Sequence, residues 1–367
     1  MHLYIHVPFC ARRCSYCDFA IAVRHVVPVD AFVAAVQREW RGAVPAVTTD
    51  GATLDTIYFG GGTPSRIGGK AVAELSTAFG DAMPLADDVE ITVEANPDDI
   101  TPELAAGWRA AGVNRISLGV QSHQPSVLEW MHRTHRAEQV APAMAMLRAA
   151  GIDNISVDLI FALPTALERD WRDDLERTLA LAPEHISLYG LTVEPRTPLA
   201  RWVDRAEVRP AGDERYAGEY LLADALLTAA GFEHYEVSNF GKPGRHSRHN
   251  AGYWSGVEYL GLGPSAHSFV AGIRSWNIRE WAGYLEASDR GASVQAGAEG
   301  LSHEQRHLEA LYLGLRTTSG LSADLIPAEM AAEWRRAGWA ADRNGRLQLT
   351  TEGWLRLDAL VSRVAAS

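Results

Sequence analysis

Residues 3–17 read LYIHVPFCARRCSYC, an apolar strand-like run that ends in three closely spaced cysteines. Cys10, Cys14 and Cys17 are the only cysteines of the chain, and their C-x3-C-x2-C spacing places three thiolates in one loop. Thiolate sulfur is a soft ligand, and cysteine-rich loops commonly hold iron–sulfur clusters. The loop therefore predicts a [4Fe–4S] cluster with these cysteines as metal ligands, which leaves one iron without a protein ligand.

Two other uses of the cysteines fit the sequence less well. A disulfide framework is disfavoured, because the count is odd and a chain of 367 residues does not need disulfides to form a core. A zinc site takes four ligands, often as two separated pairs, although His6 could complete a set of three cysteines. The spacing and the early position of the loop favour the iron–sulfur cluster.

Composition and charge are those of an ordinary globular protein. The chain has 47% hydrophobic and 22% charged residues, and its formal net charge is −12. An acidic protein repels phosphate backbones, so no nucleic-acid partner is expected. The sequence shows no basic segment followed by an apolar stretch at its start, and no apolar run long enough to span a bilayer. The cysteines suit a reducing compartment. The sequence therefore predicts a soluble cytoplasmic protein.

The first two thirds of the chain alternate between strand-like and helix-like stretches, which is typical of βαβ units and a parallel sheet. Six such units predict an α/β fold, a partial (β/α)6 barrel, with a doubly wound open sheet as the alternative. Thr101 is expected to cap a helix that has Pro102 at its first position. The expected strands are 3–9, 53–59, 89–94, 113–120, 155–163 and 185–193, and the expected helices include 30–43, 137–150 and 167–181.

The pattern changes near residue 302. Two helices, a strand pair and a closing helix expected between 302 and 364 resemble a small winged-helix α+β fold. Such folds often bind DNA, but from Leu321 onward six acidic residues balance six arginines, so no basic surface is expected. We predict a barrel at 1–240, a connecting segment with a further candidate motif at 241–300 and a C-terminal winged-helix-like domain at 301–367.

Polar residues stand at the ends of the predicted strands. The glycines at 60–62 follow one strand, Glu94 ends the next, and Gln121 and Asp158 follow apolar runs further along. Ligands of parallel α/β folds bind at the carboxyl ends of strands, so these residues and the cysteine loop are expected to form one site. Taken singly, a glycine run or a loop acid is weak evidence. Asp158 is more informative, because a buried carboxylate must be paired or hydrogen-bonded.

A further candidate segment reads His249-Asn250-Ala-Gly-Tyr253-Trp254. Histidine is a common axial ligand of haem iron, and aromatic rings pack against a porphyrin face. Read on its own, a histidine beside aromatic residues is more often structural than a ligand. The segment indicates a haem site only together with other evidence.

Several motifs together resemble a known family. The stretches YIHVPFC at 4–10, GGGTPS at 60–65, GVQS at 119–122 and DLIFALP at 158–164 are similar to those of radical S-adenosylmethionine (SAM) proteins related to oxygen-independent coproporphyrinogen III oxidase. Within that family the chain resembles a branch of haem chaperones, over nearly its whole length. The resemblance implies a radical-SAM barrel with a [4Fe–4S] cluster, SAM and haem.

The resemblance also implies roles for residues. Tyr16 would contact the adenine of SAM, and Arg133 is a candidate partner for the SAM carboxylate. The 249–254 segment matches the haem motif of the chaperone branch, which implies His249 as the axial ligand, Tyr253 and Trp254 against the ring and Asn250 orienting the loop. Gly190 and His267 fall where the oxidase contacts a second SAM or the adenosyl group. The implied SAM pocket comprises Tyr4, Tyr16, Gly61, Gly62, Thr63, Glu94, Gln121, Arg133 and Asp158.

Two departures separate the chain from the oxidase. The oxidase has a further cysteine two positions after the third, where this chain has Phe19, and a long extension before the first strand, which here begins at residue 3. The chaperone branch shares both departures. We therefore expect haem binding and delivery to an acceptor protein, with decarboxylation of coproporphyrinogen III as the alternative. The sequence does not identify the acceptor, and it is compatible with a membrane-bound acceptor and with a homodimer.

Overall fold

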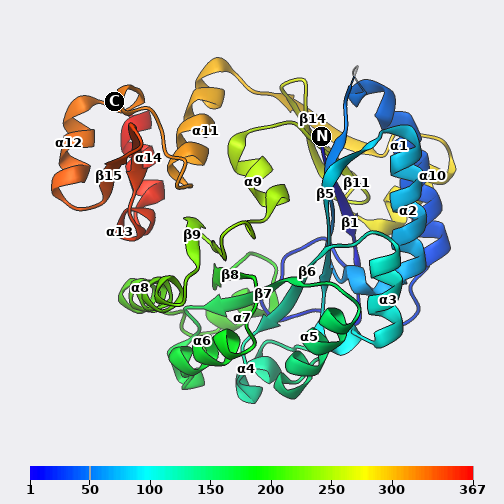
Figure 1. The fold of residues 1–367 in the computed structure, drawn as a ribbon, viewed down its shortest axis with the longest axis horizontal. Coiled ribbons are helices and arrows are strands. Elements are labelled where there is room, and N and C mark those ends of the chain that lie inside the picture. Colours follow the sequence, from blue (N-terminus) through cyan, green and yellow to red (C-terminus); the bar gives the residue numbers. More distant parts are fainter. Residues whose placement is uncertain (49–50, 367) are drawn as a thin grey trace.

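The computed structural model describes residues 1–48 and 51–366. Its centre is one curved sheet of twelve strands, with helices along its outer side (Figure 1). Six of these strands are parallel neighbours in the order β1-β4-β5-β6-β7-β8, which confirms the predicted βα units and the partial barrel. Their bounds are β1 His2–Val7, β4 Leu54–Gly61, β5 Leu85–Ala95, β6 Arg115–Gln121, β7 Asn154–Phe161 and β8 His185–Gly190.

The outer helices bury one apolar face each against these strands. Helix α1, for example, turns Phe32, Val36 and Trp40 inward, and none of them is more than 1% exposed. Burial of an apolar side chain of this size contributes roughly 1.5–3 kcal/mol, so a few such contacts fix a helix on the sheet. The helices of the barrel are α1 Val29–Val47, α2 Gly68–Ala82, α3 Pro102–Ala110, α4 Pro125–Trp130, α5 Val140–Ala149, α6 Trp171–Ala180, α7 Pro198–Asp204 and α8 Asp213–Ala229.

Side-chain caps decide where two of these helices begin. The hydroxyl oxygen of Thr101 accepts the N–H of Leu104 at 3.1 Å, as the sequence predicted. Asp170 caps α6 in the same way, through the N–H of Asp173 at 3.0 Å. Each bond satisfies one N–H that the helix itself cannot pair. Helix α6 therefore begins at Trp171, later than the expected start at residue 167, which lies in a 3-10 turn.

Residues 241–300, expected as a connecting segment, contribute further strands to the main sheet. Strand β11 pairs in parallel with β1, and β12, β13 and β14 follow as antiparallel neighbours, so this part of the chain extends the barrel sheet. At the other end, β10 and β9 continue the sheet beyond β8. The added elements are β9 Glu233–Glu236, β10 Asn239–Gly241, α9 Arg248–Ser255, β11 Tyr259–Leu262, β12 His267–Val270, β13 Ile273–Asn277, α10 Trp281–Asp289 and β14 Gln295–Gly300.

The C-terminal residues form a unit with its own hydrophobic core. Leu315, Trp334 and Leu347 are fully buried there, in a cluster distinct from the core of the barrel. Its elements occur in the expected order of two helices, a hairpin and closing helices, although the last expected helix is split in two. They are α11 His303–Leu315, α12 Ala328–Arg336, β15 Ala340–Arg343, β16 Arg346–Leu349, α13 Thr351–Trp354 and α14 Leu357–Ala365.

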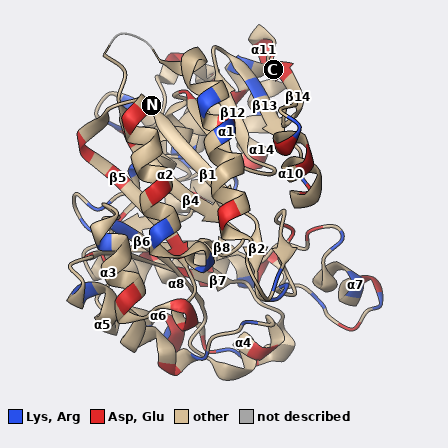
Figure 2. Ribbon diagram, turned by 90° about the vertical axis from the view of Figure 1, so that its right-hand side faces the viewer, with Lys and Arg blue, Asp and Glu red and all other residues tan. Residues whose placement is uncertain are grey.

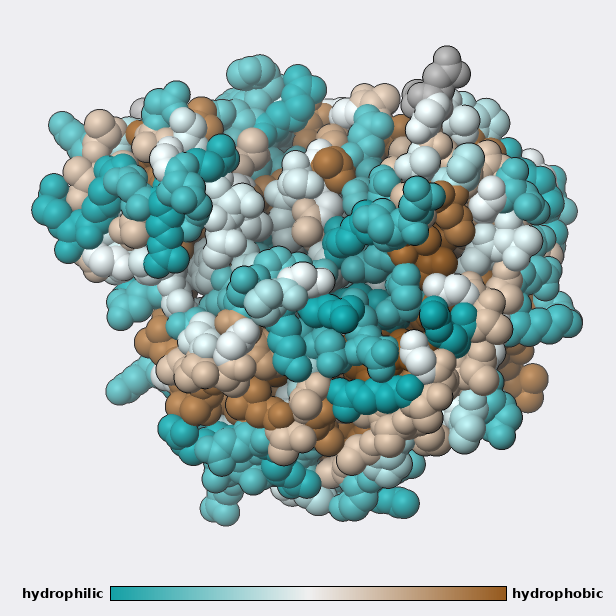
Figure 3. Space-filling view, in the orientation of Figure 1, coloured by the Kyte–Doolittle hydropathy of each residue, from teal (hydrophilic) through white to brown (hydrophobic). Residues whose placement is uncertain are grey.

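On the faces drawn, charged and hydrophobic residues are both distributed over the surface. Acidic and basic residues are interspersed along the outer helices (Figure 2). Hydrophobic residues occur as separate patches among hydrophilic ones (Figure 3), as is usual for a folded chain. Among the described residues, no helix is both long enough and apolar enough to cross a lipid bilayer.

Candidate cluster and cofactor site

The three cysteines lie where β1 ends, around a cavity of about 430 Å³. Cys10 belongs to the short strand β2 (Phe9–Cys10), which pairs with β3 (Ala22–Val23), while Cys14 and Cys17 are half-buried in the loop between them. All three thiols are free, and the Thr63 hydroxyl donates a hydrogen bond to the Cys10 sulfur at 3.4 Å. Burial raises the pKa of the Cys10 thiol and raises that of Cys17 to about 12.

The donor set fits a cluster better than a single ion. No group of three or more His, Cys, Asp or Glu side chains in the described part of the chain is arranged around one metal ion. Each thiolate of a [4Fe–4S] cluster binds a different iron, so its ligands stand further apart than those of zinc. His6 does not complete a zinc site, because its ring nitrogens bond to the Ala20 carbonyl and the Tyr4 hydroxyl at 2.9 and 3.1 Å.

Two glycines at the end of β4, Gly61 within it and Gly62 just after it, allow the chain to pass directly beside the cysteine strand. Gly61 has a φ of +111°, and a Cβ there would lie 2.6 Å from the His6 ring. A Cβ on Gly62 would lie 2.8 Å from the backbone of Pro8. Any larger residue would push the glycine loop away from the cysteine strand. Both glycines and Thr63 line the cavity.

Glu94 and Asp158 bring two carboxylates to the cavity from β5 and β7. Glu94 accepts hydrogen bonds from the Tyr58 hydroxyl at 2.9 Å and from the Gly61 N–H at 3.0 Å. Burial raises its pKa to about 7. Asp158 accepts from the Ser117 hydroxyl at 2.9 Å, and burial raises its pKa too. Both groups have further lone pairs for a hydroxyl or ammonium donor in the cavity.

Arg133 places a positive charge at the edge of the cysteine loop. Its guanidinium lies 3.6 Å from the Cys14 sulfur and donates to the Asn96 side chain at 2.5 Å and the Gly119 carbonyl at 2.8 Å. The sequence had not assigned a role to Asn96, although it stands two residues after Glu94 in the same strand-end motif. Gln121, Tyr16 and Gly190 also line the cavity, and Gln121 has a φ of +67°.

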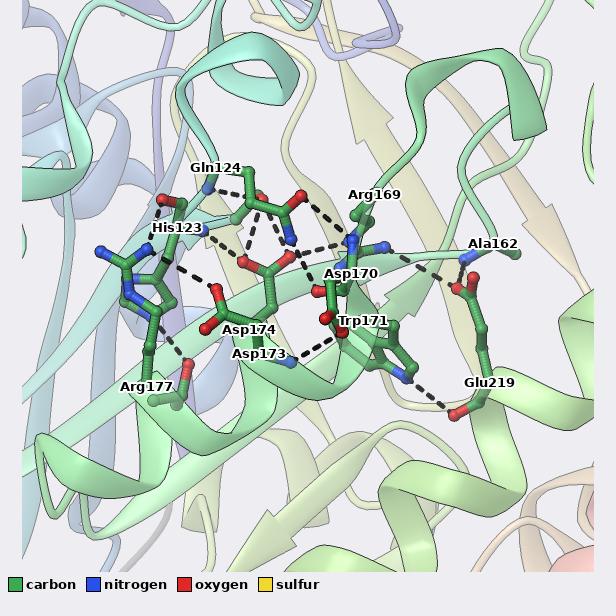
Figure 4. Close-up of polar contacts among 12 residues, drawn as sticks. His123, Gln124, Ala162, Arg169, Asp170, Trp171, Asp173, Asp174, Arg177 and Glu219 are labelled. Atoms are coloured by element: carbon green, nitrogen blue, oxygen red, sulfur yellow. Dashed lines mark hydrogen bonds and ion pairs between the residues drawn. The ribbon is translucent and has the colours of Figure 1, made fainter.

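A buried ion-pair network centres on Asp174 and Arg169, close to His123 and Ala162 (Figure 4). Asp174 of α6 accepts from the Ser122 hydroxyl at 2.8 Å, from the His123 N–H at 2.6 Å and from Arg169 at 2.8 Å. Arg169 also lies 3.7 Å from Glu219, which accepts the N–H of Ala162 just after β7. The network thereby ties the turns after β6 and β7 to α6 and α8.

Two residues assigned to SAM stand outside the cavity. Tyr4 of β1 is not among the lining residues; it stacks on Tyr58, and its hydroxyl bonds to the His6 ring. His267 is exposed on β12 and stacks on Trp276, so the structure does not bring it to the cysteines.

The segment predicted as a haem motif lies in helix α9, and the side chain of His249 is buried. Its ring nitrogens bond to the Thr56 hydroxyl at 2.6 Å and the Tyr253 hydroxyl at 2.9 Å, and only 1% of the residue is exposed. Its backbone N–H donates to the buried Glu90 at 3.0 Å. In this arrangement both ring nitrogens of His249, which was predicted as an axial ligand, have hydrogen-bond partners within the protein.

The other motif residues are placed differently. The Asn250 N–H donates to the Ser247 hydroxyl at 3.3 Å, which caps α9, and Trp254 packs under the guanidinium of Arg316. Neither these residues nor His249 line the cysteine cavity. The predicted haem motif and the predicted SAM pocket are therefore two separate places in the fold.

Comparison with known proteins identifies the family. A sequence model described as the Radical SAM superfamily matches residues 4–178. Heme chaperone HemW of Mycobacterium tuberculosis is 40% identical over 365 residues, which cover 98% of this chain and 93% of that protein. Heme chaperone HemW of Escherichia coli is 33% identical, with 98% and 97% covered.

A solved structure supports the fold independently. Coproporphyrinogen III oxidase (HemN) from Escherichia coli, a radical SAM enzyme, matches with a TM-score of 0.80 at 21% identity and covers 98% of this chain and 88% of that one. At this identity the likeness shows a shared fold. Together with the near full-length relatives, it places the chain in the HemW family of radical SAM proteins.

Proposed function

We propose that this protein binds haem and delivers it to an acceptor protein, and that it carries a [4Fe–4S] cluster and SAM. The observation that supports this most strongly is the likeness to proteins named heme chaperone HemW, at 33–40% identity along 98% of the chain. The likeness includes the C-terminal unit as well as the barrel.

The cavity at the end of β1 would hold the cluster and SAM. Cys10, Cys14 and Cys17 would be the iron ligands, and the cluster would supply one-electron chemistry to a SAM bound at its open iron. Arg133 would hold positive charge beside the Cys14 sulfur. Glu94 would accept hydrogen bonds from SAM donors without further loss of solvation, since it is already buried.

The rival function is oxidative decarboxylation of coproporphyrinogen III. The TM-score of 0.80 to the oxidase supports it, because the two proteins share the fold that surrounds the cluster. The likeness to chaperones is stronger in sequence, at 33–40% against 21% identity. We therefore keep the oxidase as the second candidate.

A two-arm experiment separates these functions. Protein prepared without oxygen, with its cluster intact, is incubated with SAM, a reductant and coproporphyrinogen III, and the same preparation is mixed with haem and then with a haem-free acceptor protein. We expect no protoporphyrinogen IX in the first arm, and haem binding followed by transfer in the second. Formation of protoporphyrinogen IX over many turnovers, with no haem transfer, would contradict the proposal.

A further inference from the structure

A continuous chain of hydrogen bonds leads from the start of α9 to Asp158 of the cysteine cavity. The Ser247 N–H donates to the Tyr235 hydroxyl oxygen at 3.2 Å, and that hydroxyl lies 2.8 Å from Nε2 of His185. Nδ1 of His185 lies 2.8 Å from the Ser156 hydroxyl, which donates to Asp158 at 3.3 Å. Residues of α9, β9, β8 and β7 are thereby joined to one carboxylate of the cavity.

The members of this chain are shielded from solvent. Ser247, His185 and Ser156 are 0% exposed, and Tyr235 is 7% exposed. Buried polar groups of this kind must satisfy one another. Burial and the positive charge of Arg115 hold the pKa of His185 well below its usual value. The imidazole is therefore neutral and carries a single N–H, so one of its nitrogens donates and the other accepts.

The end of the chain at α9 decides which nitrogen carries the proton. A backbone N–H can only donate, so the Tyr235 oxygen accepts from Ser247. In the described part of the chain the Tyr235 hydroxyl has no acceptor other than Nε2 of His185, and it donates there. The proton of His185 consequently lies on Nδ1 and is donated to the Ser156 oxygen. The hydrogen of the Ser156 hydroxyl is then left for Asp158.

We propose that His185 is a positioning residue for SAM. Its Nδ1–H holds the Ser156 hydroxyl in the orientation that donates to Asp158, and this fixes the lone pairs that the carboxylate presents to the cavity. The distance of 3.3 Å from Ser156 to Asp158 is long for two oxygens, and a hydroxyl that is not held on its other side turns freely. The inference rests on the proposed function, because it takes SAM as the ligand of the cysteine cavity.

Other groups also act on Asp158. Ser117 donates to it at 2.9 Å, and Ser187 of β8 bonds to it as well. Each of these groups is present in every variant of the test, so its effect on pH dependence is common to all of them. The titratable and charged groups that face Asp158 in the described part of the chain are Tyr58 of β4, Glu94 of β5, Arg115 of β6 and Tyr189 of β8.

Two variants of His185 provide the first test. His185→Leu removes the N–H donor, whereas the amide of His185→Asn can place an N–H near the position of Nδ1. SAM affinity is measured by equilibrium dialysis with the full chain, prepared without oxygen and loaded with its cluster. At about pH 6 we expect roughly tenfold weaker binding for His185→Leu, and recovery to within about threefold for His185→Asn.

The pH dependence separates positioning from a general loss of structure. The bond from Ser156 lowers the pKa of Asp158, so its loss lets this carboxyl take up a proton more readily. A protonated carboxyl is a poorer acceptor for the hydroxyl and ammonium donors of SAM. We therefore expect the loss of affinity in His185→Leu to be smaller at about pH 8 than at about pH 6.

Tyr235→Phe provides the second test and decides alone should His185→Leu not fold. Without the phenol, no donor holds the His185 proton on Nδ1, and SAM binding should again weaken most at low pH. The matched control is Tyr220→Phe. Tyr220 is 3% exposed, and its hydroxyl donates to the Val237 carbonyl at 2.7 Å, so SAM affinity should not change.

Circular dichroism and iron content confirm that each variant folds and keeps its cluster. Unchanged SAM affinity in His185→Leu or in Tyr235→Phe would overturn the proposal, as would a loss that is equal at the two pH values. Failure of the unaltered protein to bind SAM would instead overturn the proposed SAM site.

Discussion

Replacement of Arg169 by methionine should destabilise the barrel strongly, because it leaves a buried acid without its cation. The side chains of Arg169 and Asp174 are both 0% exposed, and their atoms lie 2.8 Å apart. Removing one partner of a buried ion pair typically costs about 3–5 kcal/mol. Asp174 keeps its bonds from Ser122 and His123, and Glu219 keeps Arg215 at 2.7 Å. We therefore expect a loss of about 3 kcal/mol in the free energy of unfolding, at the lower end of that range.

Urea unfolding followed by far-ultraviolet circular dichroism measures this loss, with all variants at equal cluster content. The matched control is Arg172→Met, a nearby arginine in α6. Arg172 pairs with Glu176 at 3.6 Å, but both side chains are more than half exposed. Exposed pairs contribute about 0–1 kcal/mol, so the control should change little. A loss below about 1 kcal/mol for Arg169→Met, or one equal to the control, would refute the assigned role of the network.

Three other predictions concern the site and its frame. Between about pH 4.5 and 7, the difference in free energy of unfolding should shift in favour of Glu94→Gln over the unaltered SAM-free protein, by at most about 3 kcal/mol in urea unfolding. The reason is that burial raises the pKa of Glu94, so its ionisation costs free energy in the folded state. A difference that does not change with pH would contradict this. Thr101→Ala should cost about 1 kcal/mol in the same assay by removing the cap of α3, and a neutral result would show that the cap is not needed. Replacing Cys10, Cys14 and Cys17 together by alanine should abolish bound iron and sulfide in reconstituted protein. A full cluster in this variant would contradict the assignment of these cysteines as iron ligands.

The barrel could be predicted from the sequence because short stretches of the chain carry the patterns that indicate its strands and their polar ends. Apolar strands with polar residues at their ends recur along the chain, and the structure brings Glu94, Gln121 and Asp158 to the same cavity as the cysteines. Strand bounds shift by only a few residues, as in β6, expected at 113–120 and observed at Arg115–Gln121. Parallel βα units place these ends together whatever the exact bounds are.

The rest depends on partners that are far apart in sequence. His249 faces inward because Thr56 and Glu90 satisfy its ring and backbone, and these residues lie 193 and 159 positions away. The membership of β11 in the main sheet depends on its pairing with β1. Neither contact leaves a local pattern in the chain. The motif could therefore be recognised while its orientation could not.

Haem titration of anaerobically prepared, cluster-loaded protein tests the haem-chaperone function most directly. The Soret absorbance is followed while haem is added to a fixed concentration of the full chain. We predict that the Soret absorbance saturates at about one haem per chain, as expected for one ligated iron. A signal that rises linearly without an end point, in protein that retains its full iron and sulfide content, would contradict a haem-carrying function for this protein.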